Sequence, residues 1–126
     1  NLDGAYANVI GIFIKQCLDD VPMTINGDGN QKRDFIYVGD VIRANILAAK
    51  SNKIGFGEVI NIGNGKNISI NDVAQLIGNN TIHKKPVSES FANLADVSKA
   101  KKLLDWEPLV QLEDWIISYK SKIGLN

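Results

Sequence analysis

Residues 27–41 read Gly27-Asp28-Gly29-Asn30-Gln31-Lys32-Arg33-Asp34-Phe35-Ile36-Tyr37-Val38-Gly39-Asp40-Val41. The two glycines predict a turn, because glycine adopts positive φ without a steric penalty. The β-branched and aromatic run of residues 34–38 predicts a strand. Asp40 is a plausible N-cap for a helix that follows it. The stretch therefore predicts a turn, a strand and a capped helix in succession, with Arg33 at the root of the strand.

Helices and strands are predicted in alternation on both sides of this stretch. Apolar residues recur at helical spacing within residues 10–18, and residues 23–26 read as a short strand. Downstream, residues 58–63 predict another strand, and Ser69 and Asp72 resemble a capping box for a helix. The remaining predicted elements are an end to that helix at Gly78, an extended segment over 81–87, a helix capped by Asp96 and a last helix closed by Gly124. This alternation indicates an α/β or α+β fold.

Composition narrows the class of protein. The 126 residues suit one domain and carry 14 basic and 14 acidic side chains, so the formal net charge is zero. Nucleic-acid binders usually show a basic excess, so we expect no nucleic-acid partner. One or two placed cations are enough for an anionic small molecule. The single cysteine, Cys17, fits a reducing cytoplasm, and no apolar run approaches the roughly 20 residues of a membrane span.

Several patterns of catalytic or cofactor sites are missing from the sequence. A dinucleotide loop needs Gly-x-Gly-x-x-Gly, but after Gly63-Asn64-Gly65 the third glycine position holds Ile68, so we expect a plain turn there. No Tyr-x-x-x-Lys occurs: Tyr6, Tyr37 and Tyr119 are followed four residues later by Ile10, Val41 and Ile123. The lone His83 is interpreted as a surface residue, and Cys17 as part of a helical core face. We therefore predict no catalytic residue, no metal ligand and no cofactor-binding residue in this chain.

The stretch at 27–41 closely resembles the Gly-Asp-Gly-x-Gln-x-Arg-Asp-Phe-x-Tyr-Val-x-Asp-Val signature of the extended short-chain dehydrogenase/reductases, specifically the nucleotide-sugar epimerase/dehydratase family. Three other segments agree with that family in the right order. Residues 6–10 resemble the segment after its Tyr-Gly-Pro-Arg motif. Residues 58–65 resemble its Val-Tyr-Asn-Ile-Gly-x-Gly strand and turn, and residues 95–108 its Ala-Asp-x-Ser-Lys helix. The resemblance covers nearly the whole chain.

This resemblance implies an α/β fold, a small mixed sheet with flanking helices, formed as the C-terminal portion of such an enzyme. It implies that residues 1–126 are a single substrate-binding portion, without the N-terminal Rossmann domain that holds the glycine loop and the Tyr/Lys pair. The parent enzyme would use NAD, which this chain alone would not bind, and would act on a nucleotide-sugar, with UDP-sugar 4-epimerases as the nearest members. Two alternatives stay open: a non-catalytic nucleotide- or protein-binding module, and a remnant with a structural role only.

Three site residues follow from the resemblance. In UDP-sugar members the Arg of the Arg-Asp-Phe run contacts the nucleotide diphosphate, and Arg33 matches it; its planar fork suits phosphate oxygens. Asn26 matches an Asn that contacts the nucleoside in some members, and Asn8 matches one that contacts the phosphates. An ion pair of Arg33 with Asp34 or Asp28 would explain that residue equally well. A turn or capping role would explain either asparagine.

One segment departs from the family pattern. The family usually carries an Arg-x-Gly-Asp run that supplies a second diphosphate contact, and its Arg position falls on or near Pro86. Lys85 or Lys84 would substitute as a point charge without the bidentate fork. A solvated lysine pair is the alternative. The nucleotide type and the affinity for it are therefore left open.

We also expect a homo-oligomer. Residues 34–38, as a strand without its upstream neighbours, would leave an unpaired edge. The helix face formed by Ile10, Phe13, Ile14 and Cys17 would leave an apolar patch. Bare strand edges pair with other copies, and large apolar patches mark interfaces.

Overall fold

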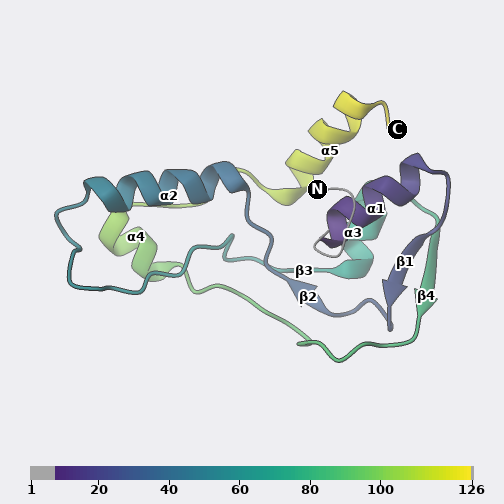
Figure 1. Cartoon of the computed structure of the whole chain (residues 1–126), viewed down its shortest axis with the longest axis horizontal. Coiled ribbons are helices and arrows are strands. Elements are labelled where there is room, and N and C mark those ends of the chain that lie inside the picture. Colours follow the sequence, from purple (N-terminus) through teal and green to yellow (C-terminus); the bar gives the residue numbers. More distant parts are fainter. Residues whose placement is uncertain (1–7, 126) are drawn as a thin grey trace. The chain divides into compact units, whose positions relative to one another are not determined.

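The computed structural model describes residues 8–125, which divide into two compact units (Figure 1). The first unit contains the described residues up to Lys32, Ile68–Phe91 and those from Ile116 onward. The second contains Arg33–Asn67 and Ala92–Trp115. Each unit buries apolar side chains of its own, and each is described separately below. None of the helices within residues 8–125 is both long and apolar enough to cross a membrane.

The first unit is built on two parallel strands, β1 (Met23–Asn26) and β4 (Thr81–Lys84), which pair in register from Met23 opposite Thr81 to Asn26 opposite Lys84. A helix precedes each strand: α1 (Val9–Leu18) leads into β1, and α3 (Ile70–Ile77) leads into β4. Figure 1 shows the two strands side by side, with α1 running opposite to β1. The predicted helix over 10–18 and the predicted strand over 23–26 are both confirmed.

The core of the first unit follows from these periodicities. Residues of β1 alternate, so that Met23 and Ile25 face inward while Asn26 is exposed. The side chain of Gln16 on α1 binds Thr24 of β1 twice. Its Nε2 donates to the Thr24 hydroxyl, and its Oε1 accepts the Thr24 backbone N–H, each at 3.0 Å. The buried apolar side chains of this unit are Phe13, Ile14, Met23, Ile25, Ile70, Val73, Ala74, Ile77 and Ile116.

The expectation of a bare patch on the first helix was wrong. Phe13 and Ile14 are each only 1% exposed, because α1 packs against β1 and α3 of its own unit. Cys17 lies on the same side, half-buried, and a Cβ added at Gly78 would meet its Sγ at 2.9 Å. This helix face is therefore core, and the prediction of a core role for Cys17 agrees with its surroundings.

Ser69 begins α3 as the sequence predicts. Its hydroxyl accepts the N–H of Asp72 at 3.1 Å and donates to the Asp72 carboxylate at 2.6 Å. The helix ends at Gly78, whose N–H donates to a carbonyl in the last turn. A second, very short two-stranded sheet pairs β2 (Lys32–Arg33) with β3 (Ile68–Ser69), immediately before this cap. The last helix, α5, covers Leu112–Ile123.

The second unit packs α2 (Val38–Lys50) on α4 (Ser98–Leu104) around Trp106 (Figure 1). Ala44 of α2 and Ala100 of α4 are small enough to let the helices approach, and Leu104 and Trp106 complete the buried cluster. The ring of Trp106 donates its N–H to the carbonyl of Asp40 at 2.9 Å, so the buried indole is satisfied. The predicted helix near residue 96 is confirmed, although it begins at Ser98, whose N–H is bound by the Asp96 carboxylate.

Two predicted strands of this unit are absent, although the side chains of the second, residues 58–62, alternate in burial as predicted. Residues 34–37 are irregular, and α2 begins at Val38. Residues 58–63 belong to neither of the two sheets that residues 8–125 form, yet Ile60 and Ile62 pack on the core while Val59 is 78% exposed. Period-2 burial can be read from a sequence, but a strand also needs a neighbour for its backbone groups, and the described chain supplies none.

Asp40 is not the predicted N-cap. The N-cap residue of α2 is Tyr37, and Asp40 lies inside the first turn, 3% exposed. Its Oδ2 accepts the backbone N–H groups of Leu109 at 2.9 Å and Val110 at 3.1 Å. The Asp40 carboxylate therefore binds backbone N–H groups distant along the chain instead of capping the start of α2.

Candidate functional site

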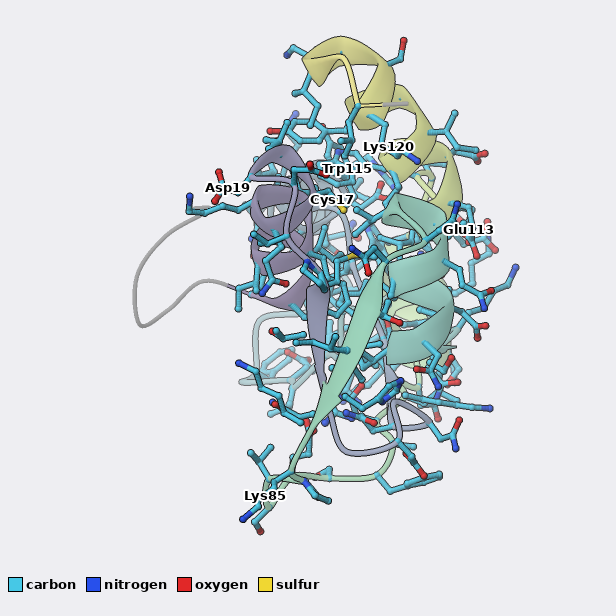
Figure 2. The ribbon with its side chains drawn as sticks, turned by 90° about the vertical axis from the view of Figure 1, so that its right-hand side faces the viewer. Cys17, Asp19, Lys85, Glu113, Trp115 and Lys120 are labelled. Carbon is cyan, nitrogen blue, oxygen red and sulfur yellow. The ribbon has the colours of Figure 1, made fainter. Side chains whose placement is uncertain are left out.

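Two of the predicted site residues meet at one edge of the parallel pair. Asn26 ends β1 opposite Lys84, and the N–H of Gly27 continues the ladder by donating to the Lys84 carbonyl at 3.0 Å. Lys85 follows directly, and Figure 2 shows it just beyond the end of β4. Both side chains are exposed. Because parallel strands end at the same edge, Asn26 and Lys85 are brought together at the kind of edge where open α/β sheets bind ligands.

Asn8 caps α1. Its side-chain Oδ1 accepts the N–H of Gly11 at 3.0 Å, and the residue is exposed. Because α1 runs opposite to β1, the N-terminal end of α1 lies toward the carboxyl end of β1 (Figure 1). The capping role left open for Asn8 is therefore present. Capping uses only the Oδ1 of the Asn8 side chain, and Nδ2 of the same side chain is a separate donor group.

The turn of residues 27–30 follows Asn26 and is held through its carbonyl oxygens. Gly27 and Gly29 have φ of 68° and 76°, which confirms the predicted glycine turn. Three side chains donate to this region: Gln31 to the Asn26 carbonyl at 2.9 Å, His83 to the Gly27 carbonyl at 2.8 Å, and Asn71 to the Asp28 carbonyl at 2.9 Å. The backbone that carries Asn26 into the turn is thereby fixed by donors from three places in the chain.

Arg33 begins the second unit at the end of β2 and is half-buried. The next residue, Asp34, has a structural task. Its carboxylate accepts the backbone N–H groups of Asn64 at 2.7 Å, Gly65 at 3.0 Å and Ala95 at 3.1 Å. The Arg-Asp dipeptide thus anchors the second unit through its acid, immediately beside the guanidinium that the sequence assigns to a ligand.

Cys17 lies well away from Lys85, toward the start of β4 (Figure 2). Burial raises the pKa of the Cys17 thiol, and the positive charge of Lys120 only partly opposes that rise. A thiol kept protonated at neutral pH is a poor nucleophile. Cys17 is therefore not a candidate nucleophile of the first unit.

Known proteins resemble this chain along most of its length. Residues 1–63 match the description "NAD dependent epimerase/dehydratase family". A UDP-glucuronate 4-epimerase of Thermodesulfobacterium geofontis is 42% identical over 113 residues, which cover 81% of this chain. The chain belongs to the NAD-dependent epimerase/dehydratase family. It spans only 33% of the length of that curated relative.

Solved structures of this family agree in fold. A UDP-glucose 4-epimerase of Thermotoga maritima, solved with UDP-glucose, superposes with a TM-score of 0.84 at 34% identity, covering 98% of this chain and 42% of that one. A UDP-glucuronic acid 4-epimerase of Bacillus cereus, solved with UDP-glucuronic acid and NAD, gives a TM-score of 0.79 at 37% identity, covering 93% and 40%. The predicted α/β class and the predicted membership in the epimerase/dehydratase family are confirmed.

The family uses NAD, but the residues described here do not fit that cofactor. The nearest candidate loop, Gly63 to Gly65, has two of its N–H groups bound by the Asp34 carboxylate instead of being open to a pyrophosphate. A Cβ added at Gly63 would lie 2.4 Å from the Cβ of Ala95, so this glycine serves close packing inside the unit. Among residues 8–125, no group of three or more His, Cys, Asp or Glu side chains is gathered as a metal site.

Sequence reasoning missed three residues that this epimerase/dehydratase chain uses to shape the region. Asp34 anchors the Gly63 turn, while Asn71 and His83 hold the Gly27 turn. Each acts on backbone at least 30 positions away in sequence, so no local pattern marks it.

Proposed function

We propose that this chain is the nucleotide-sugar-binding portion of an NAD-dependent nucleotide-sugar epimerase or dehydratase, with UDP-sugar 4-epimerization as the activity of the whole protein. The observation that carries the proposal is the location of the Gly-Asp-Gly turn: it leaves the carboxyl edge of a parallel strand pair, with Asn26 before it and Lys85 on the neighbouring strand. Relatives described as UDP-sugar epimerases, one of them solved with UDP-glucose, support the choice of ligand.

Arg33 and Lys85 are the two cations that the family resemblance assigns to phosphate. Arg33 offers a planar fork that can bind two phosphate oxygens at once, and such charge-assisted bonds are roughly twice as strong as neutral ones. Lys85 would supply the second charge, because Pro86 stands where the family usually has an arginine. A lysine acts as a point charge, so its contribution depends less on geometry and more on salt concentration.

The two asparagines would bind different parts of the ligand, Asn26 the nucleoside and Asn8 a phosphate. Asn26 is exposed at the strand end, while its own carbonyl is taken by Gln31, so its side-chain amide is the group suited to the nucleoside. Asn8 would donate through Nδ2 to a phosphate oxygen while its Oδ1 keeps capping α1. Capping and ligand binding are therefore compatible in one side chain.

The role of this portion is to bind and orient the nucleotide-sugar. NAD, held by the rest of the whole protein, would supply the hydride chemistry. We expect the 126-residue chain by itself to turn over no nucleotide-sugar, since the sequence carries neither a dinucleotide glycine loop nor a Tyr-x-x-x-Lys pair. A cytoplasmic location and a homo-oligomeric state complete the proposal.

Nuclear magnetic resonance titration of the ¹⁵N-labelled chain with UDP, dTDP, GDP and ADP tests the proposal. We expect UDP to bind most tightly and to shift the amides of Asn26, Arg33 and Lys85. Replacing Arg33→Ala should weaken UDP binding by about tenfold, and Arg33→Lys should restore only part of the affinity. Lys50→Ala, an exposed cation at the end of α2, is the matched control and should change nothing.

Two results would overturn the proposal. One is a chain whose spectrum is well dispersed but does not respond to any of the four nucleotides. The other is an unchanged UDP affinity in a folded Arg33→Ala variant, which would make Arg33 a structural residue.

A further inference from the structure

We infer that Asn71 and His83 are positioning residues, which hold the turn of residues 27–30 in a fixed shape and thereby set the affinity of the adjoining edge for a nucleotide. The inference rests on the proposed function for its ligand. Its structural part, the hold on the turn, stands on contacts within the first unit alone.

Asn71, in the first turn of α3, binds the turn of residues 27–30 by hydrogen bonds. Its Nδ2 donates to the Asp28 carbonyl at 2.9 Å and to the Asn30 side-chain oxygen at 3.3 Å. Its backbone N–H donates to the Gly29 carbonyl at 3.0 Å. A Cβ added at Gly29 would lie only 2.0 Å from Asn71 Oδ1, so the asparagine packs directly on the glycine. Asn71 thus binds three of the four residues of the turn, Asp28, Gly29 and Asn30, and it packs against the backbone of Gly29.

His83, on β4, binds the first residue of the turn by a hydrogen bond. Its Nδ1 lies 2.8 Å from the Gly27 carbonyl oxygen. A carbonyl oxygen only accepts, so Nδ1 must carry a proton in this bond. His83 therefore acts as a hydrogen-bond donor to the turn.

Together the two side chains leave the turn little freedom. Gln31 holds the Asn26 carbonyl, His83 holds the Gly27 carbonyl, and Asn71 holds the carbonyls of Asp28 and Gly29. Glycine-rich segments lose more conformational entropy on ordering than others do. If the turn is ordered before the ligand arrives, binding does not have to supply that ordering, and affinity is higher.

Three substitutions separate positioning from simple folding. Asn71→Ala removes the Nδ2 donor and favours the helix, so α3 should remain formed. His83→Leu removes the donor on β4. His83→Asn keeps an N–H group at the place of Nδ1 and is the rescue variant. We expect Asn71→Ala and His83→Leu to weaken UDP binding by about three- to tenfold, and His83→Asn to stay within about twofold of the original chain.

Amide hydrogen exchange of Gly27 to Asn30 in the unliganded chain measures the hold on the turn directly. Exchange should accelerate in Asn71→Ala and His83→Leu but not in His83→Asn. Thr81→Ala, at the other end of β4 and also exposed, is the control for general effects on that strand. Its exchange at the turn and its UDP affinity should match those of the original chain.

The outcomes separate the two proposals. Unchanged exchange in both Asn71→Ala and His83→Leu overturns the hold on the turn, and faster exchange with unchanged UDP affinity overturns the link to binding. If the original chain does not respond to UDP, the proposed function fails. Exchange that is slow in that chain and fast in the two variants would still support the positioning of the turn.

Discussion

The chain contains two Gly-x-Gly runs, one in each unit, and opposite chemistry holds them in place. In the second unit, Gly63-Asn64-Gly65 presents N–H groups to an internal acceptor, the carboxylate of Asp34. In the first unit, the turn at Gly27-Asp28-Gly29 presents carbonyl oxygens to internal donors on Asn71 and His83. The sequences of the two runs differ at one position of three, but one run is bound through its N–H groups and the other through its carbonyl oxygens.

This difference shows which turn can serve a ligand. A phosphate needs donors, and the amides of the Gly63 turn are already occupied by a carboxylate that carries the same charge. The Gly27 turn is fixed through its acceptors instead, and the Asp28 carboxylate takes the N–H of Asn30 at 2.9 Å. Ligand contacts at this edge should therefore come from the side chains around the turn, such as Asn26 and Lys85, and not from its backbone.

Removing the internal anion of the second unit should have the largest effect. Asp34→Ala strips the acceptor from three backbone N–H groups, and each buried or half-buried donor left without a partner costs about 1 kcal/mol or more. We expect the free energy of unfolding to fall by about 3 kcal/mol in urea denaturation. Asp28→Ala, the carboxylate of the other turn, should cost less than about 1 kcal/mol. Equal losses for the two variants would contradict the difference between the turns.

A pair of glycine substitutions compares the turns directly. Gly29→Ala and Gly65→Ala both force alanine to positive φ, 76° and 74°, which costs about 1 kcal/mol each. Gly29→Ala also collides with Asn71 Oδ1 at 2.0 Å, whereas the added Cβ at Gly65 meets Val97 at 3.2 Å. Thermal unfolding should show a total loss of about 2 kcal/mol for Gly29→Ala and about 1 kcal/mol for Gly65→Ala.

The double variant Gly29→Ala with Asn71→Ala sharpens this test. Asn71→Ala removes the colliding oxygen, so the second substitution should cost less in its presence than alone. Additive losses would mean that the steric contact between Gly29 and Asn71 is not what excludes alanine from the turn.

The sequence predicts well what depends on nearest neighbours. The periodicity of residues 10–18, the Ser69 cap and the turn after Asn26 are set by interactions within a few positions, and all three are present. The fold class followed from a fifteen-residue motif that matches a known family, and the comparisons confirm it. The roles of Arg33, Asn26, Asn8 and Lys85 stay predictions that the experiments above test.

The features that the sequence did not predict are hydrogen bonds to partners distant along the chain. The Asp34 and Asp40 carboxylates were predicted to start a strand and to cap a helix, but backbone donors 30 to 70 positions away bind them. Residues 58–63 have the alternation of a strand without a strand beside them in the described chain. For residues 58–62 the local pattern gives the burial correctly, while in each case the hydrogen-bond partner is a property of the whole chain.

A second internal carboxylate predicts how the second unit responds to acid. Burial opposes ionisation of Asp40, but the bonds from the Val110 N–H, Arg43 and the Leu109 N–H outweigh it, so the pKa of Asp40 is lowered from its ordinary value of 3.8. A lowered pKa in the folded state stabilises the fold above pH 3.8, and this contribution disappears as the pH falls through the folded value.

Asp40→Asn tests this contribution. The variant should lose about 1–2 kcal/mol at pH 7 and should show a weaker fall in stability than the original chain as the pH drops below 3.8. Parallel acid-denaturation curves for the two proteins would show that Asp40 has the same pKa folded and unfolded, and that its hydrogen bonds do not favour the ionised form.

The two units finally differ in how their first helix meets solvent, and the smallest effect on stability is expected here. The face of α1 that carries Phe13 and Ile14 is buried, but α2 exposes a stripe at helical spacing: Val38 at 64%, Ile42 at 54% and Ile46 at 49%. The expected homo-oligomer should therefore use α2 and not α1. Lysine at both isoleucines, Ile42→Lys with Ile46→Lys, places charge on the stripe without opening the core. It should shift sedimentation at tens of micromolar toward the monomer while changing the unfolding free energy by less than about 0.5 kcal/mol. Phe56→Lys, at an apolar side chain outside the stripe that is 98% exposed, is the control and should leave association unchanged. If Phe56→Lys dissociates the chain as well as the double variant does, association is a general response to apolar exposure, and α2 is not a specific contact surface.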